Sequence, residues 1–175
     1  MNSADEIKGQ TCPACLKPTL ILRQEEIDIP YFGRTYILLM DCSSCKFRRS
    51  EVEAAEEKPP ARYTLEIDSE KDMNIRVVRS SQGTIKIPHI GSLECGDDAE
   101  GFVSNIEGVL QRFKAQIEAV KEGDDEPQVQ ENARNLIKKI NRIIYGNQKT
   151  KMIIEDPSGN SAIISEKAVV EKLKK

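Results

Sequence analysis

Two short stretches, Cys12-Pro13-Ala14-Cys15 and Cys42-Ser43-Ser44-Cys45, decide how this chain folds at its beginning. Two residues separate the cysteines within each stretch, and 26 residues separate the two stretches. Each pair turns tightly enough to aim two thiolates at one tetrahedral ion. Because four protein ligands leave no coordination position for water, such an ion stabilises a fold and does not catalyse. The pattern predicts one structural Zn²⁺ bound by Cys12, Cys15, Cys42 and Cys45.

Two other uses of these cysteines deserve comparison with zinc. A redox-active dithiol usually shows a single C-x-x-C at the start of a helix within a βαβ pattern, and no such pattern surrounds either pair. Iron also occupies four-thiolate sites, and the spacing does not distinguish it from zinc. The fifth cysteine, Cys95, is unpaired and is expected to be a small buried apolar residue or a loop thiol.

The residues between the cysteine pairs predict a β-hairpin with the metal-binding turns at its base. Thr19 to Ile29 and Arg34 to Asp41 are rich in β-forming residues, and residues 30–33 (Pro-Tyr-Phe-Gly) supply the turn between them. An acidic stretch then meets Lys58-Pro59-Pro60, which is typical of a boundary. We expect a zinc ribbon over residues 1–58 and a second domain over residues 59–175.

The second domain alternates between strand and helix patterns. Strands are expected at Arg62–Ile67, Ile75–Arg79, Thr84–Ile87, Lys151–Ile154 and Ser161–Ile164. Between them, apolar residues recur every three or four positions, which predicts a helical hairpin within about residues 98–146, its first helix opening on a capping box at Ser104. The tail from Ser165 to Lys175 is expected to be a short, charged end that could form a helix. The fold class is therefore mainly β with an α insertion, because the last strands need partners from the first set.

Composition limits the classes of function. The chain has 175 residues, 38% of them hydrophobic and 31% charged, which is typical of a folded protein. No apolar run approaches a bilayer-spanning length and the start is polar, so we expect a cytoplasmic protein that makes no membrane contact. The formal net charge of -3 means that any attraction for phosphate backbones must come from a local patch.

Few residues suggest catalysis. His89 is the only histidine and has no nucleophile signature nearby. The acidic residues Asp97, Asp98 and Glu100, like those at Asp124 to Glu126, are expected in helix-entry turns, where negative charge is favourable. Phosphate-binding glycine motifs are absent from the sequence. We therefore expect a binding protein and not an enzyme.

A basic and aromatic cluster, Lys46-Phe47-Arg48-Arg49, follows the second cysteine pair. Such a cluster can contact RNA phosphates and stack a base. It can also be a solvated ribbon face whose charge is offset by Glu51 and Glu53, and we favour this second interpretation.

Several stretches together resemble the ZPR-type zinc-finger family, in the single-module form found in archaea. They occur in order along most of the chain: Cys12–Cys15, Cys42–Val52, Arg76–Ser80, Ile106–Leu110 and Asp156–Ser161. The family often has glycine where Lys46 stands here, at a position of the turn that suits a left-handed backbone.

The resemblance implies a zinc finger followed by a double-stranded β-helix with an inserted helical hairpin. It also implies protein binding, because eukaryotic members associate with translation elongation factor 1-alpha, assist its folding and bind receptor kinase tails. By resemblance we expect this chain to bind an elongation factor 1-alpha type GTPase. The alternative, which rests on the basic cluster beside Phe47, is that this chain is an RNA-binding zinc-ribbon protein of the translation apparatus. The exposed contacts expected are Phe47, Arg48 and Arg49 beside the zinc, and Asp156 and Asn160 in the turn at residues 156–160. That turn could equally be chosen for its backbone geometry alone.

Overall fold

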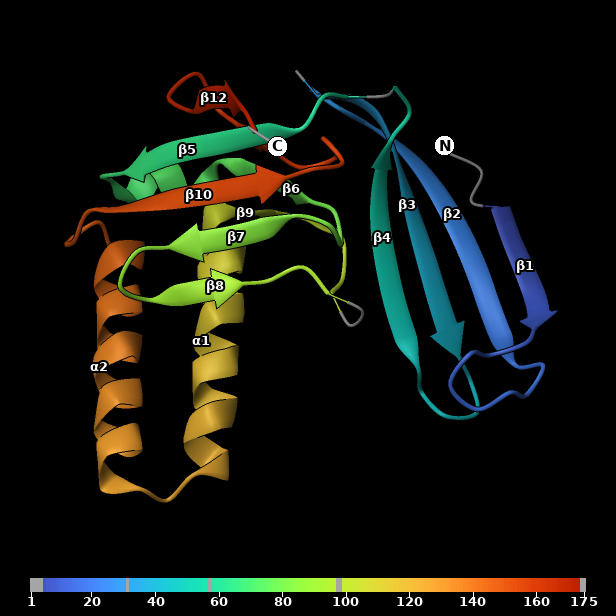
Figure 1. The fold of residues 1–175 in the computed structure, drawn as a ribbon, viewed down its shortest axis with the longest axis horizontal. Coiled ribbons are helices and arrows are strands. Elements are labelled where there is room, and N and C mark those ends of the chain that lie inside the picture. Colours follow the sequence, from blue (N-terminus) through green and yellow to red (C-terminus); the bar gives the residue numbers. More distant parts are fainter. Residues whose placement is uncertain (1–4, 31, 57, 97–98, 174–175) are drawn as a thin grey trace.

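The computed structural model describes residues 5–30, 32–56, 58–96 and 99–173, which form two β-rich parts joined side by side (Figure 1). The N-terminal part is one antiparallel sheet in the order β1-β2-β3-β4. Its strands are β1 (Asp5–Gln10), β2 (Leu20–Ile29), β3 (Gly33–Cys42) and β4 (Arg48–Ala54). The expected hairpin is confirmed as β2 and β3, which pair along their whole lengths from Leu20 opposite Cys42 to Ile29 opposite Gly33.

The C-terminal part is a jelly roll made of two sheets. A five-stranded sheet has the order β12-β5-β10-β7-β8, and a three-stranded sheet has the order β11-β6-β9. The elements before the helices are β5 (Ala61–Ile67), the short 3-10 helix η1 (Glu70–Asn74), β6 (Arg76–Arg79), β7 (Thr84–Ile87), β8 (Gly91–Leu93) and β9 (Phe102–Asn105). Those after them are β10 (Thr150–Asp156), β11 (Ala162–Ile164) and β12 (Val169–Lys172). β10 pairs with both β5 and β7, so the strand after the helices completes the sheet begun before them.

One apolar core fills the space between the sheets and the base of the helices. Its fully buried members come from both sides of the helical insertion, among them Leu65, Ile85, Met152 and Ile154. Alternation along β10 explains this, because Met152, Ile154 and Asp156 point inward while Lys151 is exposed.

The helical hairpin consists of α1 (Ile106–Gly123) and α2 (Pro127–Ile144), which extend away from the sheets (Figure 1). The hairpin was expected, but the residue that caps α1 was not. Asn105 is the N-cap, and its side-chain oxygen accepts a hydrogen bond from the backbone N–H of Gly108 at 2.8 Å. Ser104 still belongs to β9, where it pairs with Val77, so the expected capping box at Ser104 was wrong.

The tail forms β12 and not a helix. Residues 169–172 pair antiparallel with residues 61–64 of β5, which gives the otherwise unpaired edge of that strand a partner. Val169 and Val170 are β-branched and favour this extended conformation. Local charge suggested a helix, whereas the available sheet edge decided the outcome.

Within the described residues, the two parts share a small apolar cluster and four hydrogen bonds. Ile29, Phe32 and Val52 of the ribbon pack with Val78 and Ala162 of the jelly roll. Ser50 and Gly101 exchange two bonds, since the backbone N–H of Gly101 donates to the Ser50 carbonyl at 2.9 Å and the Ser50 hydroxyl donates to the Gly101 carbonyl at 2.6 Å. The remaining two join the backbone N–H of Ser81 to Glu51 and that of Ala54 to Asn160. β4 is therefore held against the jelly roll along most of its length.

Candidate metal centre and partner-binding surface

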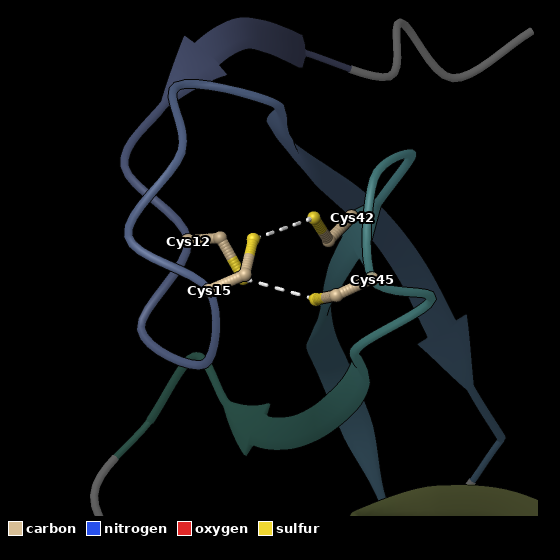
Figure 2. A group of neighbouring side chains, drawn as sticks. All are labelled: Cys12, Cys15, Cys42 and Cys45. Atoms are coloured by element: carbon tan, nitrogen blue, oxygen red, sulfur yellow. Dashed lines mark hydrogen bonds between the residues drawn. The ribbon is translucent and has the colours of Figure 1, made fainter.

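The four predicted cysteines converge at one end of the ribbon sheet (Figure 2). Their sulfur atoms all lie within 4.8 Å of one another. The Sγ atoms of Cys12 and Cys45 are 3.7 Å apart, and those of Cys15 and Cys42 are 3.8 Å apart. A tetrahedral Zn²⁺ with Zn–S bonds of about 2.3 Å requires sulfurs about 3.8 Å apart. The residues present therefore fit one structural zinc ion.

Each pair of cysteines is held in a similar turn. The residue after the second cysteine adopts a left-handed backbone, with φ of 59° at Leu16 and 64° at Lys46. Its N–H donates back to the carbonyl of the first cysteine, from Leu16 to Cys12 at 2.9 Å and from Lys46 to Cys42 at 3.1 Å. The turn that glycine would favour is thus formed with lysine, at a cost in backbone strain of about 1 kcal/mol.

The surroundings of Cys42 favour its thiolate. The backbone N–H of Cys45 and the hydroxyl of Thr19, 3.2 Å from the sulfur, lower the pKa of the Cys42 thiol to about 6. Cys12 and Cys42 are buried in a small apolar cluster with Leu20, and Phe47 packs against this cluster. Among the described residues no other group of three or more potential ligand side chains is placed to hold an ion.

The basic cluster beside the zinc site is only partly available to a partner. Arg48 is exposed, but its Nε lies 2.9 Å from a carboxylate oxygen of Asp41. Phe47 and Arg49 are half-buried. Leu16, which the sequence did not single out, is 76% exposed directly after the first cysteine pair. The zinc end of the ribbon therefore presents an apolar side chain as well as Arg48 to solvent.

The expected exposed contact at Asp156 was wrong, because the side chain is fully buried. Its carboxylate accepts hydrogen bonds from the Ser80 hydroxyl at 2.8 Å, from the backbone N–H of Ser158 at 2.7 Å and from the Ser158 hydroxyl at 2.6 Å. The hydroxyl of Ser161 donates a further bond. Asp156 is a structural residue that fixes the turn after β10.

Asn160 is half-buried and faces the ribbon. Its side-chain oxygen accepts a hydrogen bond from the backbone N–H of Ala54, so this amide joins the two parts of the chain. Gly159, which lies between Asp156 and Asn160 in this turn, has a φ of 75°, and a Cβ added to it would lie 2.4 Å from the Lys58 carbonyl oxygen. The turn at residues 156–160 thus serves packing between the domains.

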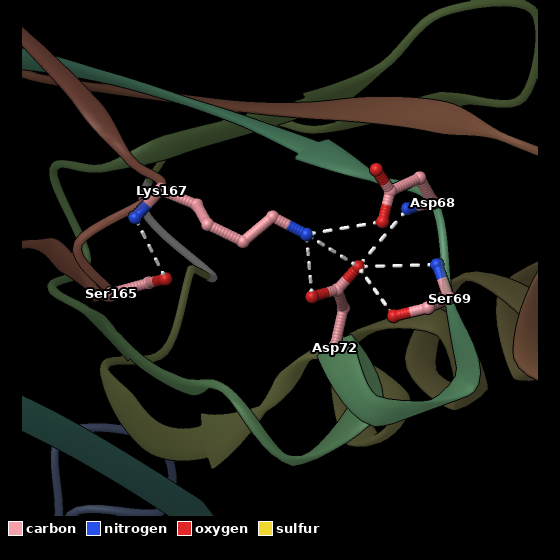
Figure 3. A network of polar contacts seen from close by, with 5 residues as sticks. All are labelled: Asp68, Ser69, Asp72, Ser165 and Lys167. Carbon is pink, nitrogen blue, oxygen red and sulfur yellow. Dashed lines mark hydrogen bonds and ion pairs between the residues drawn. The ribbon is translucent and has the colours of Figure 1, made fainter.

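Sequence reasoning also missed a polar network at the other end of the jelly roll (Figure 3). The ammonium of Lys167 lies 2.8 Å from the nearer carboxylate oxygen of Asp72 and 3.1 Å from Asp68. Asp72 also accepts bonds from the backbone N–H groups of Asp68 and Ser69. Burial raises the pKa of Asp72, but Lys167, the backbone N–H of Asp68 and the hydroxyl of Ser69 outweigh it and lower the pKa to about 2.

The two remaining candidates, His89 and Cys95, lie in loops of the jelly roll. His89 lies in the turn between β7 and β8 with φ of 60°, and its carbonyl accepts a bond from the Lys139 ammonium at 3.4 Å. Cys95 is an exposed loop thiol, the second of the two expectations for this residue.

A four-thiolate zinc ribbon packed on a jelly roll with a helical hairpin defines a zinc-finger protein with a closed, structural metal site. Residues 6–60 match the ZPR1 zinc-finger domain, and residues 71–174 match the ZPR1 jelly-roll domain. This chain belongs to the ZPR1 zinc-finger family.

Relatives in two archaea span most of the chain. A ZPR1-like protein of Methanocaldococcus jannaschii is 40% identical over 164 residues, covering 93% of this chain and 83% of that protein. One of Pyrococcus horikoshii is 41% identical over 175 residues, covering 97% and 78%. The zinc finger chaperone zpr1 of Schizosaccharomyces pombe is 29% identical over 139 residues, which cover 77% of this chain and 30% of that protein. Neither helix of the described chain combines the length and apolarity that a membrane crossing requires.

Proposed function

We propose that this chain is a zinc-containing protein-interaction module that assists the folding or assembly of an elongation factor 1-alpha type GTPase in the cytosol. The observation that carries the proposal is the closed four-thiolate site, which leaves no position for a substrate and instead shapes an exposed end of the ribbon. A related protein of Schizosaccharomyces pombe is named a chaperone, which supports a protein client.

The surface at the zinc end suits a protein better than RNA. Leu16 supplies an exposed apolar side chain, and burying such a side chain against a protein partner is favourable by about 1.5–3 kcal/mol. Phe47 is half-buried against the zinc-site cluster, which leaves little of its ring for base stacking, whereas the Arg48 side chain is 78% exposed and can pair with an acidic group of a protein partner. We infer binding, and not catalysis, as the role of this surface.

Affinity purification of the tagged chain from its native cell, followed by identification of the bound proteins, tests the proposal. Recovery of the elongation GTPase is the expected result. The double variant Arg48→Ala with Arg49→Ala should lose it while keeping one zinc per chain. The matched control changes Lys8 and Arg34, exposed cations on the same sheet, to Ala. Failure to recover the GTPase with the unchanged chain would contradict the proposal.

A further inference from the structure

The longest stretch of the sequence without an acidic residue begins inside α2, directly after Glu131, and continues into β10. From Asn132 to Ile154 the chain has six basic residues and no acidic residue, although its net charge is -3. Because the whole chain is acidic, any attraction for phosphate groups must come from a local basic patch, and this segment forms such a patch. The basic residues are Arg134, Lys138, Lys139, Arg142, Lys149 and Lys151.

Three of these residues form a stripe on one face of α2. Arg134, Lys138 and Arg142 follow one another at intervals of four, so they lie along the same side of the helix, and all three are exposed. The opposite side of α2 is buried through Ala133, Ile140 and Ile143. Tyr145 stands at the end of the helix and is 68% exposed. We call these four residues (134, 138, 142 and 145) the α2 stripe.

The α2 stripe has one acidic neighbour on its side of the helix, the exposed Glu131, which lies three residues before Arg134. Within the described part of the chain, no carboxylate oxygen lies within ion-pair distance of Arg134, Lys138 or Arg142. Like charges four residues apart destabilise a helix by roughly 0.2–0.5 kcal/mol per pair, so the arrangement is not explained by helix stability. In contrast, α1 mixes the signs of its charges, as at Lys114, Glu118, Lys121 and Glu122.

The composition of the stripe indicates the class of partner. The centre of a protein–protein interface is apolar and poor in charge, whereas the surface of α2 around the stripe offers cations and the amides of Asn135 and Asn141. Interfaces with nucleic acids are polar and strongly positive. An exposed tyrosine beside cations can stack an unpaired base. The distance along the helix from Arg134 to Tyr145 is roughly 16 Å, enough for about five nucleotides of one strand.

We propose that the α2 stripe binds single-stranded nucleic acid, with Arg134, Lys138 and Arg142 contacting phosphates and Tyr145 stacking on a base. This activity is separate from the GTPase interaction proposed for the zinc end of the ribbon. Contacts to phosphates and stacking on a base do not distinguish one base from another. Binding should therefore depend on the charge of the strand and on base stacking, and not on the nucleotide sequence.

Fluorescence anisotropy with a labelled 12-nucleotide oligouridylate tests the proposal on the intact, zinc-loaded chain. Three phosphate contacts predict that affinity falls about 20-fold between about 50 mM and about 200 mM salt. The variant R134Q/K138Q/R142Q should bind at least about tenfold more weakly and lose most of this salt dependence. The charge-matched control K8Q/K17Q/K172Q removes three exposed cations elsewhere and should bind as the unchanged chain does. Circular dichroism checks that each variant is folded.

Further probes separate the proposed ligand from other polyanions. Tyr145→Ala should weaken binding about fivefold and Tyr145→Phe should not, because stacking needs the ring and not the hydroxyl. Oligothymidylate binding as tightly as oligouridylate supports recognition of any single strand, whereas preference for the RNA supports an RNA ligand. Equal affinity for a duplex, equal competition by polyglutamate, or equal loss in both triple variants would overturn the proposal. So would the absence of oligonucleotide binding at low salt.

Discussion

The side-chain oxygen of Asn160 accepts a hydrogen bond from the backbone N–H of Ala54 at 3.1 Å, across the boundary between jelly roll and ribbon. The two residues are 106 positions apart in the chain. The bond therefore reports directly on whether the two domains are packed together.

Substituting Asn160 with Ala should destabilise this contact. The Ala54 N–H would lose its acceptor in a partly buried place, which costs about 1–2 kcal/mol. Amide hydrogen exchange at Ala54 should accelerate, and the ribbon should become more sensitive to proteolysis. Asn160→Asp keeps an acceptor and serves as control. Unchanged exchange at Ala54 in the Ala variant would contradict this assignment.

Gly101→Ala should separate the domains more strongly. A Cβ at this position would lie 2.5 Å from the backbone nitrogen of Val52, and backbone atoms of β4 cannot move without breaking the paired bonds to Ser50. We expect a loss of about 2–3 kcal/mol, measured by denaturant unfolding. Gly96→Ala is the matched control, since its Cβ would meet no atom within 4 Å. Equal stability of the two variants would argue against close packing at Gly101.

Asp156→Ala should be among the most destabilising single changes in the jelly roll. It leaves the hydroxyls of Ser80 and Ser158 without their acceptor in a buried site, and we expect a loss of about 3 kcal/mol in the free energy of unfolding. Asp156→Asn retains the shape and one acceptor oxygen and should cost less. If the Ala variant unfolds at the same denaturant concentration as the unchanged chain, the buried network contributes no stability.

Removing the metal should unfold the zinc end of the ribbon. Four thiolates within 4.8 Å repel one another unless a cation is present, and structural zinc contributes about 10–16 kcal/mol to small zinc domains. Elemental analysis should find one zinc per chain, and Cys45→Ser should reduce this content sharply. Cys95→Ser, at an exposed thiol away from the cluster, should leave the content unchanged. Retention of a full equivalent of zinc by the Cys45 variant would contradict the four-ligand site.

The Asp72–Lys167 pair predicts a loss of stability in acid. The pKa of Asp72 is lowered from 3.8 to about 2 in the folded chain, so between about pH 4 and pH 2 the unfolded chain binds more protons. The carboxylate contributes about 2 kcal/mol above pH 4, and this contribution is lost as the pH falls through about 2.

Comparing Asp72→Asn with the unchanged chain across this pH range isolates that contribution, because protonation of the zinc ligands affects both proteins equally. The difference in unfolding free energy should be largest at neutral pH and should vanish near pH 2. A difference that does not change with pH would assign the effect to packing.

Local patterns were sufficient for the features that depend on neighbouring residues. The spacing of Cys12, Cys15, Cys42 and Cys45 determined the zinc site, because each pair is confined to one tight turn. The three-to-four-residue periodicity of apolar positions determined the helical hairpin, since the burial of one helix face leaves that pattern in the sequence. Alternation likewise predicted β5 and β7.

Only the tertiary structure decided features that depend on distant partners. The sequence around Asp156 is typical of an exposed turn. In the structure its carboxylate is buried and accepts a hydrogen bond from Ser80, which is 76 positions away in the chain. The tail became β12 because β5 offers an unpaired edge, and Ser104 became a strand residue because Val77 pairs with it. The α2 stripe has the same origin, since burial of Ala133, Ile140 and Ile143 against the rest of the chain turns its three cations together toward solvent. Backbone pairing and burial over long separations leave no signal in a single sequence, whereas metal-ligand spacing and helical periodicity do.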